Sequence, residues 1–301
     1  MSYVLVTPAR NEAAYIEKTL TSVVNQTVLP ARWVIVSDGS TDATDAIVSS
    51  FAARYPFITL LRREADKERN FGSKVLAFRA GYEQAREAPH DFVGNLDADI
   101  ELPADYYEQM LFRFARNPRL GLAGGIRFDF CDGAFVLVDC ARNSVGGPYQ
   151  FFRRSCYDAI GGYTPLPRGG IDAVAEIMAR QHGWTVRSFP EVKAHHYRCT
   201  GTAKGNVFQA AYRSGMKEYV LGYDPFFELF RCAGQARSLR GVGLGVCQAA
   251  GYARAAAGRF ERPLPTAFVD YLRSEQRARL RHVLTLRADP ASREQEASMP
   301  S

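Results

Sequence analysis

The sequence lacks the cysteine spacing, the long apolar runs and the leader that mark several large classes of protein. Its six cysteines are widely separated among 301 residues and include no Cys-x-x-Cys pair. We therefore expect neither a zinc site nor a disulfide scaffold, and this cysteine usage suits a reducing cytosol. The apolar stretch 241–258 is interrupted by Gln248 and Arg254 and falls short of the roughly 18 uninterrupted apolar residues of a spanning helix. Residues 1–7 lack the basic segment and apolar core of a signal peptide, which predicts no export by the general secretory route.

The remaining composition is that of an ordinary globular protein with an uneven distribution of charge. Hydrophobic residues make up 47% and charged residues 23% of the chain, which excludes disordered and collagen-like classes. The formal net charge is +6, and from Phe226 onward twelve arginines face seven acidic residues. This basic segment favours an anionic partner, and since no nucleic-acid-binding motif accompanies it, we expect no nucleic acid. The aromatic residues within 219–230 favour an anionic membrane surface, with a solvated arginine-rich helix as the alternative.

Strand-like and helix-like segments alternate along the first hundred residues. We predict strands at 3–7, 33–37, 57–61 and 92–96, and helices at 12–24, 42–53 and 74–86. Strands separated by helices indicate βαβ units and a parallel sheet. Beyond residue 99 we predict helices at 104–116, 154–160 and 172–181, and extended segments at 120–130, 134–138 and 186–196.

The pattern becomes mainly helical from residue 208. We therefore predict one α/β catalytic domain over residues 1–205 and a helical, basic region over 206–288 that associates with a membrane or with the acceptor. The polar tail 289–301 is predicted to be disordered.

Polar residues follow three of the predicted strands where each strand ends. Asp97 and Asp99 come directly after strand 92–96, and the segments 7–12 and 38–42 follow the first two strands. In a parallel sheet these ends share one edge, which is where open α/β sheets bind ligands. Two carboxylates two residues apart share a side of an extended chain, and such oxygen donors suit Mg²⁺ or Mn²⁺ carrying a diphosphate. Singly, each segment also fits an acidic turn or a helix N-cap.

The order and spacing of these and later motifs are specific in combination. The motifs are Pro8-Ala9-Arg10-Asn11-Glu12, the segment 34–42, Gly72-Ser73-Lys74, Leu96-Asp97-Ala98-Asp99, Phe152-Arg153-Arg154, Ile160-Gly161-Gly162-Tyr163, and Asp172 eleven residues before Gly183. Over residues 2–200 the chain resembles the family 2 glycosyltransferases, which are inverting enzymes that use nucleotide-activated sugars. The resemblance implies the GT-A fold: a Rossmann-like, mixed but mainly parallel sheet flanked by helices, here with a helical C-terminal appendage.

The resemblance also implies a donor site at the shared edge of the sheet. Donor-nucleotide contacts are implied at Pro8, Arg10, Glu12, Asp38, Lys74 and Asp97. Asp97 and Asp99 are implied to serve the ribose and a Mn²⁺ or Mg²⁺ ion, with Asp99 the more direct ligand. Several relatives have a metal-binding histidine at the distance of His195 and His196 from Asp172. Since only one of two adjacent strand residues faces the site, we favour His196 as a metal ligand.

By the same resemblance, Asp172 is the general base that deprotonates the acceptor hydroxyl. The family commonly has glutamate before this aspartate, whereas this chain has Ile171. The alternative is that Asp172 only caps its helix. Glu176, one turn later, is a second candidate base or orienting residue. The acceptor-side candidates are Tyr149, Gln150, Arg153, Glu176 and Arg198.

The resemblance implies a metal-dependent inverting glycosyltransferase of the hexosyltransferase type. It would move a sugar from a UDP-, GDP- or dTDP-sugar to a hydroxyl of a glycan or lipid-linked acceptor, in surface polysaccharide or glycolipid assembly. We expect it in the cytoplasm, either free or peripheral at the inner face of the cytoplasmic membrane. One alternative is a non-catalytic module that binds nucleotide or glycan. Another is a sugar-phosphate nucleotidyltransferase, which normally opens with a glycine-rich loop where this chain has residues 8–12.

Overall fold

The computed structural model describes residues 1–64, 71–138, 141–199, 206–236 and 238–288. The chain divides into two compact units, residues 1–200 and 201–301. The predicted boundary at residue 205 and the predicted disordered tail 289–301 lie outside the described residues. Within the described ranges, no helix is long and apolar enough to cross a membrane.

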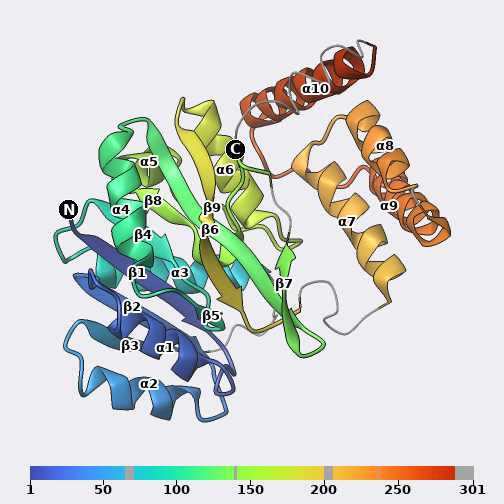
Figure 1. Ribbon diagram of the computed structural model, residues 1–301. Coiled ribbons are helices and arrows are strands. Elements are labelled where there is room, and N and C mark those ends of the chain that lie inside the picture. The colour runs from blue at the N-terminus through green and yellow to red at the C-terminus, as the bar shows by residue number, and fades with distance from the viewer. Residues whose placement is uncertain (65–70, 139–140, 200–205, 237, 289–301) are drawn as a thin grey trace. The chain divides into compact units, whose positions relative to one another are not determined.

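The first unit is built on one nine-stranded sheet in the order β3-β2-β1-β4-β8-β6-β9-β5, with β7 paired to β6 (Figure 1). The strands are β1 (Tyr3–Ala9), β2 (Arg32–Asp38), β3 (Ile58–Arg63), β4 (Phe92–Asn95), β5 (Ile100–Glu101), β6 (Leu120–Cys131), β7 (Ala134–Val138), β8 (Phe151–Arg153) and β9 (Thr185–His196). Strands β1 to β4 pair in parallel, whereas β8 runs antiparallel to both β4 and β6. The predicted mixed, mainly parallel sheet is confirmed.

Helices cover the sheet and bury its central strands. They are α1 (Ile16–Val24), α2 (Thr44–Ala52), α3 (Phe71–Ala85), α4 (Tyr106–Arg116), α5 (Arg154–Ala159) and α6 (Ile171–Gln181), with a short 3₁₀ turn, η1 (Gly147–Tyr149). Val4, Leu5 and Val6 of β1 are all fully buried, because a parallel strand covered on both faces is apolar at every position. Helix α3 lies directly on this region, since a Cβ at Gly81 would come within 2.6 Å of the Val6 side chain.

A disulfide joins Cys131 to Cys199 across 68 residues of sequence, which contradicts the expectation that the cysteines form no disulfide. Strands β6 and β9 pair in parallel up to Asp129 and His196, so the two cysteines meet just beyond the paired ends. Their sequence spacing gave no signal because this strand pairing is non-local. Disulfides persist in oxidising compartments, so the cysteines no longer support the expected reducing cytosol.

The second unit is helical, as predicted. It contains α7 (Val207–Leu221), α8 (Pro225–Gly234), α9 (Leu239–Ala257) and α10 (Thr266–Ala288). Helices α7 and α9 are in close contact, because a Cβ at Gly215 would lie 1.9 Å from the carbonyl oxygen of Gln248. The Gln248 side chain donates hydrogen bonds of 2.8 Å to both Glu218 and Glu228, and Arg231 pairs with the same two carboxylates. This buried polar network fixes α7, α8 and α9 together.

Candidate functional site

The carboxyl ends of β1, β2 and β4 border a cavity of about 180 Å³, which we call the strand-edge cavity. Its lining residues are Pro8, Ala9, Arg10, Glu12, Asp38, Ser73, Lys74, Ala77, Asp97, Ala98, Asp99 and Arg198. All six residues predicted to contact the donor nucleotide are among them. The three strands are neighbours in the order β2-β1-β4, so polar segments far apart in sequence meet at one edge.

Asp97 faces a lysine in this cavity. The Lys74 ammonium lies 2.6 and 2.8 Å from the two carboxylate oxygens of Asp97. Burial lowers the pKa of Lys74, but the Asp97 charge more than offsets this and holds the pKa above its ordinary value. The Lys74 side chain is therefore protonated, and its contacts with the Asp97 carboxylate hold its ammonium in place.

Asp99 is held by residues from β9 and from the segment that follows it. The Arg198 guanidinium donates to Asp99 at 2.9 Å and also pairs with Glu12. His196 Nε2 lies 3.4 Å from Asp99 Oδ2. Burial raises the pKa of Asp99, yet its contacts with His196 and Arg198 more than offset this and lower it. Arg198 thus lines the strand-edge cavity next to Glu12 and Asp99, and its expected contact with phosphate of the donor or the acceptor stays a prediction.

The two adjacent histidines point to opposite faces of β9. His196 lies between Asp99 and Asp129, with its Nδ1 2.9 Å from Asp129 Oδ1. The His195 ring instead stacks on Phe135, with 4.4 Å between ring centroids. Of the two, only His196 is positioned to act beside Asp99.

The described side chains do not form a complete metal cage. Among them, no group of three or more His, Cys, Asp or Glu residues is arranged to hold a metal ion. Asp99 and His196 nevertheless offer one carboxylate and one imidazole, which are ligand types that Mn²⁺ accepts. Mg²⁺ likewise binds through one or two carboxylates and completes its shell with substrate phosphates and water. The residues present fit a cation of that kind, with the donor supplying the missing ligands.

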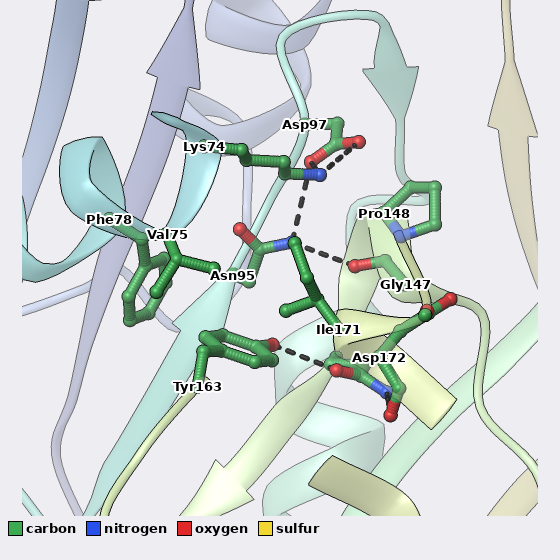
Figure 2. A pocket seen from close by; sticks show the side chains of 12 residues that line it. Lys74, Val75, Phe78, Asn95, Asp97, Gly147, Pro148, Tyr163, Ile171 and Asp172 are labelled. Atoms are coloured by element: carbon green, nitrogen blue, oxygen red, sulfur yellow. Dashed lines mark hydrogen bonds and ion pairs between the residues drawn. The ribbon is translucent and has the colours of Figure 1, made fainter. Parts of the chain in front are cut away.

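A second cavity, of about 280 Å³, lies beside the first and shares Lys74 and Asp97 with it. We call it the Asn95 cavity; it is lined by Lys74, Val75, Phe78, Asn95, Asp97, Gly147, Pro148, Gln150, Tyr163, Gly170, Ile171 and Asp172 (Figure 2). It extends from Asp97 to Asp172 and is walled mainly by apolar side chains. Ile171, which departs from the family pattern, is part of this wall.

Asp172 lies in the first turn of α6, and the N-cap of that helix is Gly170, with φ of 90°. The reading of Asp172 as a helix cap is therefore wrong, and its carboxylate is available for other contacts. The backbone of η1 approaches it closely, since a Cβ at Gly147 would lie 2.7 Å from Asp172 Oδ2. Only glycine fits at position 147 with this carboxylate in place.

A third cavity, of about 230 Å³, is also bordered by Asp172 and is called the Arg127 cavity. It is lined by Arg127, Val138, Ser144, Val145, Gly146, Gly147, Tyr149, Asp172, Ala173 and Glu176. Two predicted acceptor residues, Tyr149 and Glu176, line it, whereas Gln150 lines the Asn95 cavity. Asp172 thus faces both cavities.

Arg153 does not join any of these cavities, which corrects its assignment to the acceptor side. Its guanidinium donates to the carbonyl oxygens of Phe114 at 2.9 Å, Asn117 at 3.3 Å and Leu120 at 3.0 Å. Carbonyls at the end of a helix lack partners within the helix, and a basic side chain commonly satisfies them. Arg153 therefore stabilises the C-terminal end of α4.

Glu176 positions the segment that carries η1. Its carboxylate accepts hydrogen bonds from the Val145 N–H at 2.7 Å and the Ser144 hydroxyl at 3.2 Å. Burial raises the pKa of Glu176 to about 7, although these hydrogen bonds lower it in part. The contacts favour the orienting role over the role of a second base.

This pKa predicts a pH-dependent stability that the Glu176→Gln variant removes. The unfolded chain releases the Glu176 proton near pH 4.5 and the folded chain near pH 7, so the free energy of unfolding falls as pH rises through that window. A gap of this size corresponds to about 3 kcal/mol. We expect glutamine to leave stability almost unchanged at pH 5 and to raise it relative to wild type at pH 8, as measured by urea unfolding. Parallel pH profiles of the two proteins would contradict this.

Sequence reasoning assigned no role to Asn95, Tyr163 or Asp129, although the structure places them at the site. Asn95 is a polar residue in an otherwise apolar strand, two residues before Asp97, and this position could have marked it as a site residue. Tyr163 stood in a recognised motif without a function. Asp129 gave no signal, because its contact with His196 depends on the pairing of β6 with β9.

Comparison with known proteins relates this chain to a protein family. The family described as Glycosyl transferase family 2 matches residues 4–154. The chain is 28% identical over 113 residues to a chondroitin synthase of Pasteurella multocida, covering 38% of this chain and 11% of that protein. It is 32% identical over 115 residues to a poly-beta-1,6-N-acetyl-D-glucosamine synthase of Staphylococcus epidermidis, covering 38% of this chain and 26% of that protein. The match thus spans about a quarter or less of these relatives.

Solved structures extend the likeness over most of the chain. The mannosyltransferase PcManGT of Pyrobaculum calidifontis, in complex with GDP-Man and Mn²⁺, aligns with a TM-score of 0.54 and 17% identity over 97% of this chain and 82% of its own. S. aureus TarS 1-349 with UDP-GlcNAc aligns with a TM-score of 0.53 and 15% identity over 87% of this chain and 74% of its own. At such identities the likeness concerns the fold. The chain has the GT-A fold and belongs to glycosyltransferase family 2.

Proposed function

We propose that this protein is a metal-dependent inverting glycosyltransferase that moves a sugar from an NDP-sugar to an acceptor hydroxyl. The observation that carries this proposal is the position of Asp172 between the Asn95 cavity and the Arg127 cavity. The strand-edge cavity and the Asn95 cavity are neighbours, because Lys74 and Asp97 line both of them. A donor can therefore place its nucleotide at the strand edge and its sugar next to Asp172, with the acceptor on the opposite side.

The cations of the strand-edge cavity are placed to contact the phosphates of a nucleoside diphosphate. The cavity is lined by Arg10, Lys74 and Arg198 together with the carboxylates of Glu12, Asp38, Asp97 and Asp99. A bound divalent cation would therefore supply the further positive charge that a diphosphate needs. Asp38 lies at the β2 end, where its carboxylate can accept a hydrogen bond from the base. Asp99 and His196 would hold Mn²⁺ or Mg²⁺. When bound, the metal neutralises the charge that builds on the leaving diphosphate.

In the proposed reaction, Asp172 accepts the proton of the acceptor hydroxyl. The hydroxyl oxygen attacks the anomeric carbon from the face opposite the diphosphate and forms the new glycosidic bond. The bond between the anomeric carbon and the diphosphate oxygen breaks, and its electron pair leaves with the nucleoside diphosphate. Attack from the opposite face inverts the configuration. Lys74 and Arg198 are placed to stabilise the departing charge.

One observation supports polysaccharide or glycolipid assembly as the setting. The relatives matched in sequence are named as synthases of chondroitin and of poly-beta-1,6-N-acetyl-D-glucosamine. The acceptor in this proposal is a glycan or a lipid-linked glycan.

One observation favours a binding module without catalysis as the second candidate. Asp97 and Asp99 are both paired with cations, Lys74 and Arg198, as a site that never receives metal would have them. The two candidates differ in turnover. A binding module would bind its ligand without a metal ion and would release it chemically unchanged.

Release of nucleoside diphosphate from a panel of UDP-, GDP- and dTDP-sugars, with and without Mn²⁺, tests the proposal. We expect slow, Mn²⁺-dependent release from donors of one base even without acceptor, with water taking the place of the hydroxyl. Donor binding without any release would favour the binding module. If no donor binds and no nucleoside diphosphate is released, both candidates are refuted.

We further propose that the helical unit docks on an anionic membrane. In the aromatic stretch 219–230, Phe226 is exposed and the other aromatic residues are half-buried. Helix α9 instead presents Leu239, Val242 and Val246, spaced along one face and 94%, 44% and 63% exposed. Exposed Arg240 and Arg254 lie on the same helix. An apolar helix face bordered by arginines suits insertion among acidic lipid headgroups.

Vesicle binding of the double variant L239S/V246S tests this docking surface. Losing two exposed apolar side chains is expected to weaken binding to phosphatidylglycerol-containing vesicles more than ten-fold. The control is Leu284→Ser on α10, which removes an apolar side chain of similar exposure, 56%. Equal binding by all three proteins would contradict the proposal, as would a stable dimer that the double variant dissociates.

A further inference from the structure

We propose that the Asn95 cavity selects the transferred sugar and that it takes a sugar carrying an N-acetyl group, an inference that rests on the proposed glycosyl transfer. The Asn95 side chain is 3% exposed, and its Oδ1 is buried without a hydrogen-bond partner among the described residues. The residue lines the cavity at the strand end, two positions before Asp97. Asn95 Oδ1 is therefore an acceptor without a partner at the wall of this cavity.

The orientation of the Asn95 amide follows from its other contacts. Its Nδ2 donates to the Gly147 carbonyl oxygen at 2.7 Å and lies 3.3 Å from Asp97 Oδ1. Both of these partners are acceptors, so the amide nitrogen must face them and the oxygen must face the other way. Figure 2 shows this oxygen turned toward the side of the cavity where Lys74 and Val75 lie.

A buried carbonyl oxygen without a partner costs free energy that a donor group on a ligand recovers. The donor must be an N–H or an O–H group, because the oxygen can only accept. The other residues that line the cavity determine which chemical group the ligand carries beside this N–H or O–H.

The walls around this oxygen are apolar. Val75 and Phe78 of α3 are each 1% exposed, and Ile171 of α6 closes the cavity from the other side. The Tyr163 hydroxyl donates to Gln150 Oε1 at 2.8 Å, so the proton of this hydroxyl is already used. A lone hydroxyl beside Asn95 Oδ1 could donate to it but would bring no apolar group to the neighbouring Val75 and Phe78. The surroundings favour a methyl group beside the donor.

An acetamido group matches all of these features at once. Its N–H donates to Asn95 Oδ1, and its methyl group packs against Val75 and Phe78. Its carbonyl oxygen accepts from Lys74, which lines the same cavity and whose ammonium has a third donor besides the two that face the Asp97 carboxylate. A 6-deoxy sugar offers a methyl and a hydroxyl but gives Lys74 no carbonyl. The chemistry points to an N-acetylhexosamine as the transferred unit.

Competition among matched donors tests the inference. We expect kcat/KM for nucleoside diphosphate release to be at least about ten-fold higher for UDP-N-acetylglucosamine or UDP-N-acetylgalactosamine than for UDP-glucose or UDP-galactose, the size of one lost hydrogen bond to a buried group. Preference for UDP-glucose, UDP-galactose, GDP-mannose, GDP-fucose or dTDP-rhamnose would overturn the inference and leave glycosyl transfer intact. No release from any donor would overturn both.

Variants of the wall and of the acceptor identify the residues responsible. Asn95→Leu removes Oδ1 and is expected to lower the preference for the N-acetyl donor about ten-fold. Since this variant also loses the bond to Gly147, Val75→Ala and Ile171→Glu provide independent tests. The first removes methyl packing and the second adds a carboxylate to the wall, so both should lower the same preference. Leu76→Ala, on the exposed side of α3, is the control and should retain it. Unchanged preference in Val75→Ala and Ile171→Glu would overturn the inference.

Discussion

The Asp172→Asn variant is expected to transfer sugar about 10³-fold more slowly than wild type while binding donor with the same affinity. Asparagine keeps the size and the polar contacts of the side chain but cannot take a proton from the acceptor. Asp172 borders the Asn95 and Arg127 cavities and does not line the strand-edge cavity, where the nucleotide is proposed to bind. Proton removal and donor binding should therefore separate in this variant.

Initial rates of transfer and donor dissociation constants, measured on the same preparations, check this result. Asp158→Asn on α5 is the matched control, because its carboxylate is 56% exposed and lies outside the three cavities. Wild-type turnover by Asp172→Asn would refute the assignment of the base. Loss of donor binding in parallel with turnover would assign Asp172 to the donor instead.

The Asp99→Asn variant is expected to lose the Mn²⁺-dependent part of donor affinity, a reduction of about ten-fold or more. The amide keeps an oxygen but loses the charge that attracts a divalent cation. Without Mn²⁺, donor affinity should be unchanged or higher, because Arg198 loses one of its two charged partners and keeps only Glu12, which leaves its positive charge less neutralised toward phosphate. This combination of effects differs from that of Asp172→Asn.

Calorimetric titration of a donor with and without Mn²⁺ measures the donor affinity in both conditions and therefore the gain in affinity that Mn²⁺ provides. Asp158→Asn again serves as the control and should keep the wild-type response to Mn²⁺. An Asp99→Asn protein that gains as much affinity from Mn²⁺ as wild type would show that Asp99 is not a metal ligand. Equal affinity of the wild type with and without Mn²⁺ would refute the metal dependence itself.

The parts of the fold that depend on local patterns could be predicted from the sequence. The strands β1 to β4 and the helices between them were predicted within a few residues, because apolar strands and amphipathic helices repeat with their own periods. Strands β5 and β8 were missed, since they span only Ile100–Glu101 and Phe151–Arg153. Segments this short carry no periodic signal, and they are strands only because β9, β4 and β6 pair with them.

The candidate site shows the same division between local and non-local information. The residues after β1, β2 and β4 were predicted together because parallel strands bring their carboxyl ends to one edge. Arg153 was misplaced, and the partners of Arg198 were not predicted, because the direction of a long side chain depends on partners from distant segments. Arg153 reaches the end of α4, and Arg198 reaches Glu12 and Asp99. The disulfide between Cys131 and Cys199 likewise follows from the pairing of β6 with β9.

Titration of UDP-, GDP- and dTDP-sugars into the full chain, with and without Mn²⁺, tests the central claim most directly. The claim is that the strand-edge cavity holds the nucleotide of an NDP-sugar while the Asn95 cavity holds its sugar beside Asp172. We predict saturable binding of donors of one base, strengthened by Mn²⁺ and tighter for the complete NDP-sugar than for its free nucleoside. Absence of binding for every donor, or equal binding of the free nucleoside and the NDP-sugar, would contradict the claim.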